Sequence, residues 1–150
     1  MKRLTTSLRL LTSTFAMSLA AVPAWAQSAP APAPASVLSL ELNAAQPSEK
    51  GCRLTFVVNN ALGADLSKAA FEIALFNEAG VVDRLTVLDF KELPTGKIKV
   101  ARFDLAGADC GKLSRVLING ATECTGAGID PKACLSQLKP ETKSAIVFGV

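Results

Sequence analysis

Apolar and polar residues alternate through most of the chain after residue 36, and this period of two is the strongest constraint on its fold. Successive side chains of a strand point to opposite faces, so an alternating run gives one apolar and one polar face. The alternation is clearest where these residues share one face: Leu38, Leu40 and Leu42, and then Cys52, Leu54, Phe56 and Val58. Frequent Pro and Gly, together with many β-branched residues, disfavour helices. The pattern therefore predicts an all-β protein.

Seven segments fit this pattern, and turn residues such as Glu78-Ala79-Gly80 and Leu93-Pro94-Thr95-Gly96 separate some of them. The expected strands are 37–42, 52–58, 71–77, 81–90, 97–105, 115–121 and 145–150. We expect these side chains to face the core: Phe71, Ile73, Leu75, Leu85, Val87, Ile98, Val100 and Phe103. Asp130 and Pro131 predict a short helical turn within 130–138. Short strands at this spacing favour an antiparallel sandwich of about seven strands.

The first 26 residues have the three zones of an export signal. A basic start with Lys2, Arg3 and Arg9 precedes an apolar stretch from Leu10 to Val22. Pro23-Ala24-Trp25-Ala26 then has small residues at the two positions that signal peptidase reads, which predicts cleavage after Ala26. A transmembrane span needs about 20 apolar residues, whereas this stretch is shorter and is interrupted by hydroxyl side chains. We therefore predict a cleaved signal peptide over 1–26, no membrane span after cleavage, and a periplasmic or secreted protein.

Alternating Ala and Pro residues follow the predicted cleavage site. Such a sequence favours an extended linker, so the predicted division is a signal peptide at 1–26, an Ala/Pro-rich linker at 27–36 and a β-sandwich domain at 37–150. The three basic residues of the signal account for the whole formal net charge of +3, and the exported part is therefore close to neutral. Nucleic-acid binding usually needs a basic surface, so no nucleic-acid partner is expected.

All four cysteines, Cys52, Cys110, Cys124 and Cys134, lie in the predicted exported part. An even number of cysteines in an oxidising compartment predicts two disulfides. Three pairings are open, as are free thiols, and we favour Cys52–Cys110 with Cys124–Cys134. The second bond would close the loop at 125–133 around the predicted helical turn.

The middle of the chain also resembles a family. The residues concerned are Val57-Val58-Asn59-Asn60, the run from Phe71 to Gly80, and Leu93-Pro94-Thr95-Gly96 with Phe103. This pattern resembles immunoglobulin-like or fibronectin-III-like sandwiches of bacterial exported proteins, including the FxLYD type. The resemblance covers roughly residues 52 to 105, and the whole arrangement looks like small uncharacterised periplasmic proteins of proteobacteria. It implies an immunoglobulin-like sandwich and implies no catalytic residue.

The residue types that are missing exclude several kinds of chemistry. The sequence has no His and no Tyr, and its two Met residues, Met1 and Met17, lie in the predicted signal. Ser-His-Asp and Cys-His catalysis are excluded, as are metal sites built from His or Met. The cysteines lack the close C-x-x-C spacing of thiol oxidoreductases. We therefore expect no enzyme, no cofactor and no metal site.

Two groups of residues are candidates for surface binding. Phe76 and Phe90 lie out of phase with the predicted core and would provide a stacking surface for a small molecule or polysaccharide if both were exposed and adjacent. Arg84, Lys97, Lys99 and Arg102 would form a basic face. Such a face could bind an anionic ligand, but charges on an edge strand more often prevent aggregation between sheets.

These observations predict an exported, non-enzymatic sandwich with a structural role or an envelope protein partner in the periplasm. Two alternatives remain open: a module that binds a small molecule or polysaccharide, and an enzyme inhibitor that uses the loop at 125–133.

Overall fold

The computed structural model describes residues 36–150 of the chain, so the predicted signal peptide and almost all of the predicted linker lie outside the described residues. The strands are β1 (Val37–Ser48), β2 (Gly51–Ala61), β3 (Leu66–Asn77), β4 (Val82–Leu93), β5 (Ile98–Ala106), β6 (Leu113–Thr125), β7 (Leu138–Thr142) and β8 (Val147–Gly149). A 3-10 turn, η1 (Cys110–Lys112), precedes β6, and one helical turn, α1 (Ala133–Ser136), follows it.

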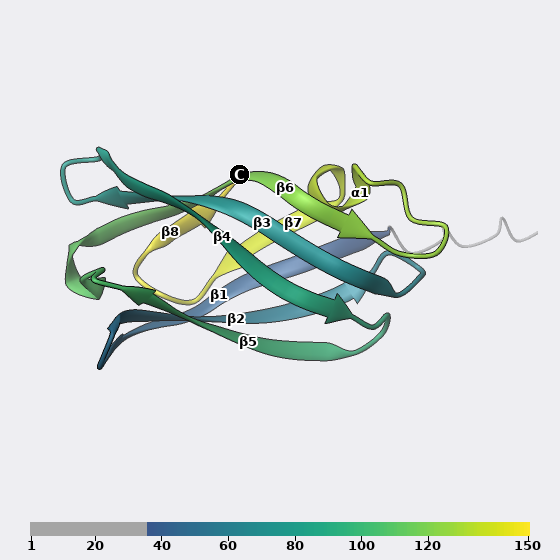
Figure 1. Ribbon diagram of the computed structural model, residues 1–150, viewed down its shortest axis with the longest axis horizontal. Helices are drawn as coiled ribbons and strands as arrows, with labels where there is room; N and C mark the ends of the chain where they lie inside the picture. The colour runs from purple at the N-terminus through teal and green to yellow at the C-terminus, as the bar shows by residue number, and fades with distance from the viewer. Residues whose placement is uncertain (1–35) are drawn as a thin grey trace, which may run out of the picture. The chain divides into compact units, whose positions relative to one another are not determined.

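The strands form two four-stranded sheets that pack as a sandwich, with the orders β5-β2-β1-β7 and β4-β3-β6-β8 (Figure 1). This confirms the predicted all-β sandwich, with eight strands in the described residues. The prediction of wholly antiparallel pairing was wrong at one side, because β7 runs parallel to β1 and β8 runs parallel to β6. Two neighbouring strands that follow α1 thus join different sheets.

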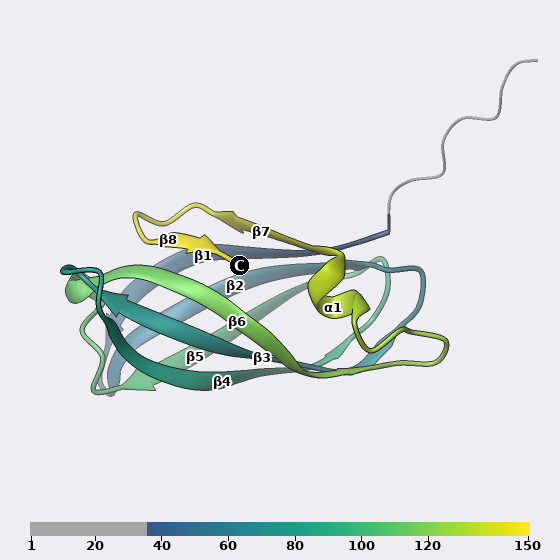
Figure 2. The ribbon, with the colours of Figure 1, turned by 90° about the horizontal axis from the view of Figure 1, so that it is seen from above.

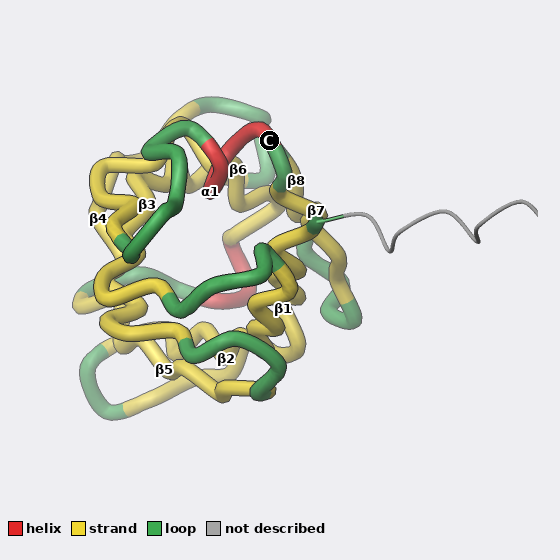
Figure 3. The backbone as a smooth tube through the Cα atoms, turned by 90° about the vertical axis from the view of Figure 1, so that its right-hand side faces the viewer, coloured by secondary structure: helices red, strands yellow, loops and turns green. Residues whose placement is uncertain are grey.

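The edges of the two sheets come close to each other on both sides of the sandwich. Seen end-on, β4 of one sheet lies beside β5 of the other, and β7 lies beside β8 (Figure 3). The turn α1 lies where the chain passes from β6 to β7 (Figure 2). We call the boundary between β4 and β5 the seam.

A cluster of phenylalanine rings fills the middle of the core. The Phe90 ring centroid lies 4.9 Å from that of Phe103, 5.5 Å from that of Phe56 and 5.8 Å from that of Phe71. The pairs are close to edge-to-face, which is a favoured geometry for aromatic rings. The core is thus built from rings of both sheets, because Phe56 and Phe103 lie on β2 and β5 whereas Phe71 and Phe90 lie on β3 and β4.

Two predicted core faces were wrong. Leu85 and Val87 are 55% and 51% exposed, and Ile98 and Val100 are 73% and 55% exposed. On β4 the inward positions are those of Leu88 and Phe90, and on β5 they are those of Ala101, Phe103 and Leu105. Both strands carry apolar residues at both parities, so the pairing with β3 and β2 decides which set is buried.

The structure contains the favoured disulfide pairing, Cys52–Cys110 and Cys124–Cys134, and no free cysteine in the described residues. Cys52 is fully buried on the inner face of β2, as the alternation predicts. Structural disulfides of this kind are typical of proteins in an oxidising extracellular or periplasmic compartment.

The short helical turn between Cys124 and β7 is also confirmed. The Asp130 carboxylate accepts a hydrogen bond from the Lys132 backbone N–H at 2.8 Å, and the Asp130 carbonyl accepts one from the Ala133 N–H at 2.8 Å. These bonds organise the chain just ahead of α1 and position Cys134 for its disulfide. Across residues 36–150, no helix is long and apolar enough to cross a membrane.

Candidate functional site

A shallow depression of about 570 Å³ lies at the β1–β2 hairpin. It is lined by Pro47 and Ser48 at the end of β1, by the turn residues Glu49 and Lys50, by Arg53 of β2 and by Asp104 of β5. The turn is tight because Gly51 has a φ of +147°, and a Cβ there would lie 2.3 Å from the carbonyl oxygen of Leu105. Glycine at this position therefore lets the hairpin press against the end of β5.

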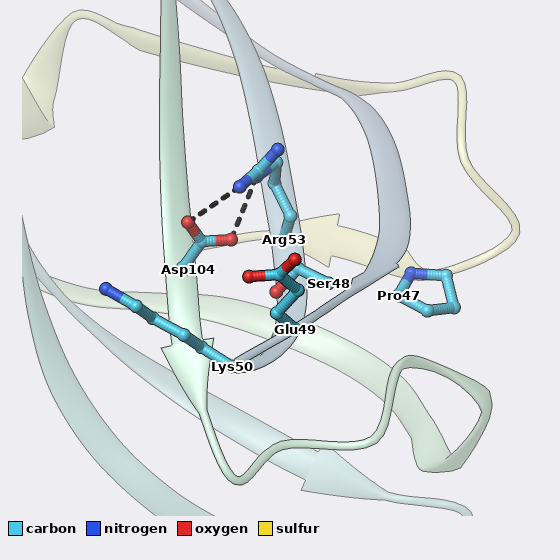
Figure 4. A pocket seen from close by; sticks show the side chains of 6 residues that line it. All are labelled: Pro47, Ser48, Glu49, Lys50, Arg53 and Asp104. Atoms are coloured by element: carbon cyan, nitrogen blue, oxygen red, sulfur yellow. Dashed lines mark hydrogen bonds and ion pairs between the residues drawn. The ribbon is translucent and has the colours of Figure 1, made fainter.

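An ion pair forms the floor of this depression. Arg53 donates from Nε to Asp104 Oδ1 at 2.8 Å and from Nη2 to Oδ2 at 2.9 Å (Figure 4). The hydrogen bond from Arg53 holds the pKa of Asp104 below its usual range, and the same bond raises the pKa of Arg53. Arg53 and Asp104 are direct partners in the β2–β5 register, so the strand pairing itself brings the two charges together.

The chemistry open to this depression is limited by that ion pair. A carboxylate that is held ionised by a bidentate guanidinium is a poor proton donor at neutral pH. Both side chains are partly exposed, with 44% of Arg53 and 30% of Asp104 accessible. The site therefore offers hydrogen-bonding groups to a partner surface rather than a reactive group in an enclosed cleft.

Three loops meet at the opposite end of the sandwich: β2–β3, β4–β5 and the loop from β6 to α1 (Figure 1). A second depression of about 480 Å³ lies among them and is lined by Asp65, Leu66, Ser67, Glu92, Pro94 and Ala127. The Asp65 carboxylate accepts a hydrogen bond from the Thr95 N–H at 2.7 Å. Gly126 approaches the Asp65 carbonyl so closely that a Cβ would lie 2.3 Å from it. These contacts join the three loops into one surface, which we call the loop end.

The loop at 125–133 is part of the loop end. Its base is fixed by the Cys124–Cys134 disulfide, and Ile129 packs against the core. Ala127 and Gly128 are exposed at its tip. The loop thus combines a fixed base with a small exposed tip.

The two candidate aromatic residues do not form a stacking surface. Phe90 is only 2% exposed and belongs to the core, so its prediction as a surface residue was wrong. The error follows from the wrong choice of face on β4, because Phe90 shares its parity with the buried Leu88 and not with the exposed Leu85. Phe76 is half-buried on the outer face of β3, where the Arg115 guanidinium lies 5.7 Å from its ring centroid.

The four candidate basic residues do not form a common face. Lys99 points into the seam, where its Nζ donates to the carbonyls of Phe90 at 3.0 Å and Glu92 at 2.7 Å. Arg84 donates from Nη1 to the Ala106 carbonyl at 2.8 Å across the same seam. Lys97 and Arg102 are exposed. The basic-face prediction was therefore wrong for Lys99 and Arg84, because both serve to connect the edges of the two sheets.

Neither Arg53 nor Asp104 was predicted as a site residue. They are 51 residues apart, and nothing in the local pattern indicates that their strands pair. The turn residues Gln46-Pro47-Ser48-Glu49-Lys50-Gly51 between the two predicted strands were the only local signal. Among residues 36–150, no group of three or more Cys, Asp or Glu residues is arranged to hold a metal ion.

Comparison with known proteins gives little similarity. No protein-family model matches the chain, and no curated protein matches it. Among solved structures, the chain is similar to the Salmonella enterica trimeric lipoprotein SadB, with 20% sequence identity and a TM-score of 0.40. The similarity covers 47% of this chain and 40% of that chain, so the chain spans less than half the length of the protein it matches. A similarity of this size supports no conclusion about fold or role.

Proposed function

We propose that this protein is exported and acts in the periplasm as a non-enzymatic scaffold, with a structural or protein-binding role. The observation that carries the proposal is the loop end, where three loops are fixed on a sandwich that has two disulfides. Loops held by a rigid scaffold are common sites of protein recognition. Because the loops are fixed before binding, little conformational entropy is lost when a partner docks.

The strand order supports the family resemblance as part of this proposal. An immunoglobulin-like sandwich has neighbouring strands A, B and E in one sheet and C and F in the other, with C′ added beside C in the variable type. The orders β1-β2-β5 and β4-β3-β6 correspond to these neighbours. The parallel strands β7 and β8 depart from that pattern, as does Cys110, which lies in η1 and not on β6.

Export and oxidation are tested first. The full-length chain is expressed in a bacterial host, and its mass is measured from the periplasmic fraction under non-reducing conditions with thiol alkylation. We expect cleavage after Ala26 and no alkylated cysteine. An intact leader, or four alkylated thiols, would overturn the proposal of an exported protein.

Partner binding is tested by site-specific photo-crosslinking in the periplasm. A crosslinking residue replaces Ala127 at the loop end, and a matched variant carries it at Glu49 in the hairpin depression. We expect a discrete protein adduct from position 127 and none, or a weaker one, from position 49. The reverse pattern would move the binding site to the hairpin, and no adduct at either position would contradict a partner role for both ends.

A second candidate function is inhibition of an enzyme by the loop at 125–133. The fixed base and exposed tip of this loop favour it, since a rigid loop resists distortion when an enzyme binds. Protease inhibition by the wild type is compared with that by a Cys124→Ala/Cys134→Ala variant. Inhibition that is lost with the disulfide would support this function, and a wild type that inhibits none of the major protease classes would exclude protease inhibition.

A further inference from the structure

The outer face of the sheet β4-β3-β6-β8 is unusually apolar for a surface. We use the name outer apolar face for seven residues on its four strands: Val82, Leu85, Val87, Ala74, Phe76, Leu117 and Val147. Of these, Val82, Leu85, Val87 and Val147 are each about half exposed, whereas Phe76 and Leu117 are partly buried and Ala74 is only 4% exposed. Contiguous exposed apolar patches on a monomer often mark interaction sites.

Strand register arranges this face in rows. The middle row runs Leu85, Ala74, Leu117 and Gly149 across all four strands. The row on one side contains Val82, Phe76, Arg115 and Val147, and the row on the other side contains Val87, Glu72 and Gly120. Neighbouring rows are about 7 Å apart along the strands. The middle row has no charged or polar side chain.

The outer face of the other sheet is different. Its rows contain charged and polar residues on every strand, such as Arg53, Glu41 and Lys139. Only Ile98, Val100 and Val57 form an apolar group there, on the two strands at one edge. The apolar character is therefore specific to one face of the sandwich.

Two side chains of opposite charge lie on either side of the middle row. Arg115 lies in one outer row on β6, and its guanidinium is held over the Phe76 ring. Glu72 lies in the opposite outer row on β3 and accepts a hydrogen bond from Asn119. A two-fold axis that lies in the plane of the interface, passes between Ala74 and Leu117 and is perpendicular to the line from Arg115 to Glu72 would place Arg115 of each copy opposite Glu72 of the other copy. An interface between identical faces must be self-complementary in this way.

We propose that the outer apolar face is the interface of a homodimer. The two copies pack sheet against sheet, as in a β-sandwich core, with the middle rows in contact and two reciprocal Arg115–Glu72 ion pairs. The ion pairs Asp89–Lys91 and Lys68–Glu123 lie beyond the row of Val87 and form a polar rim. This inference is independent of the partner proposed for the loop end.

The first test is the oligomeric state of the protein, produced from the full-length sequence and purified under non-reducing conditions. Sedimentation velocity is measured over a wide concentration range for the wild type, Leu85→Lys and the matched control Ile98→Lys. We expect a wild-type dimer, at least about tenfold weaker association for Leu85→Lys, and wild-type association for Ile98→Lys. A monomeric wild type, or equal effects of the two substitutions, would overturn the proposal.

The second test exchanges the charges. Arg115→Glu alone and Glu72→Arg alone each place like charges opposite one another, so neither variant should dimerise. An equal mixture should form a heterodimer, because both contacts then join opposite charges. Since only folded proteins can restore association on mixing, this result separates an interface from a folding defect. A mixture that stays monomeric would contradict the proposed two-fold arrangement.

Discussion

Replacing Phe90 by alanine tests whether this side chain belongs to the core, against its prediction as a surface residue. The side chain is 2% exposed and contacts three other phenylalanine rings across both sheets. Truncating a buried Phe to Ala costs about 3–5 kcal/mol, because transfer free energy is lost and a cavity remains. A domain of this size has a stability of about 5–15 kcal/mol, so the loss is a large fraction of the total.

Urea unfolding followed by far-UV circular dichroism measures this loss. With an m-value of about 2 kcal/mol/M, Phe90→Ala should lower the midpoint by roughly 2 M. Phe76→Ala is the matched control, because Phe76 is half-buried on the outer face, and it should cost clearly less. Phe90→Leu should recover more than half of the loss by filling most of the cavity. A Phe90→Ala midpoint close to that of the wild type, or a larger effect of Phe76→Ala, would refute the assignment of Phe90 to the core.

Three further predictions concern other parts of the sandwich. Gly51→Ala should destabilise the protein by about 3 kcal/mol or more, because its Cβ would meet the backbone of Leu105. Gly80→Ala, at a φ of +75° with open space around it, should cost only about 1 kcal/mol. The urea unfolding midpoints of the two variants measure this difference. Removing Cys52–Cys110 by a double substitution to Ala should cost about 4 kcal/mol of stability, and removing Cys124–Cys134 about 3 kcal/mol. The difference arises because closing the longer loop removes more entropy from the unfolded chain. Equal or reversed losses in thermal unfolding would contradict this order. Asp104 has a folded-state pKa below its unfolded value of about 3.9. Its contribution to the free energy of unfolding is therefore fully present above the unfolded value and is lost as the pH falls through the folded-state pKa. Asp104→Asn should lower the unfolding midpoint at neutral pH, and the difference from wild type should disappear in strong acid.

The alternation of residues was sufficient to predict the sandwich and several of its inner faces. On β1 and β2 one parity is apolar throughout the inner face and the other is mostly polar, so Leu40 and Phe56 could be assigned to the core from the sequence. On β4 and β5 both parities carry apolar residues, and the choice between Leu85 and Leu88 depends on pairing with β3. Periodicity shows which residues share a face, but it does not show which face is covered.

The candidate site could be predicted less well, because it depends on contacts between distant segments. Lys99 is a charged residue at an inward position, and its two carbonyl partners on β4 exist only because the edges of the two sheets meet. The Arg53–Asp104 pair likewise requires the β2–β5 register. The disulfide pairing was more predictable, since Cys52 had core parity and Cys124 and Cys134 lie 10 residues apart.

The parallel strands β7 and β8 determine when the two sheets can be completed, because both follow all of the other strands in the chain. Thr142 of β7 hydrogen-bonds the Leu42 carbonyl of β1 across 100 residues of sequence, and β8 joins the other sheet shortly afterwards. A chain emerging from its N-terminal end must therefore hold one side of β1 and of β6 without a neighbouring strand until these late residues arrive. Contacts over such sequence distances slow folding, and unpaired strand edges are prone to association with other chains during that interval.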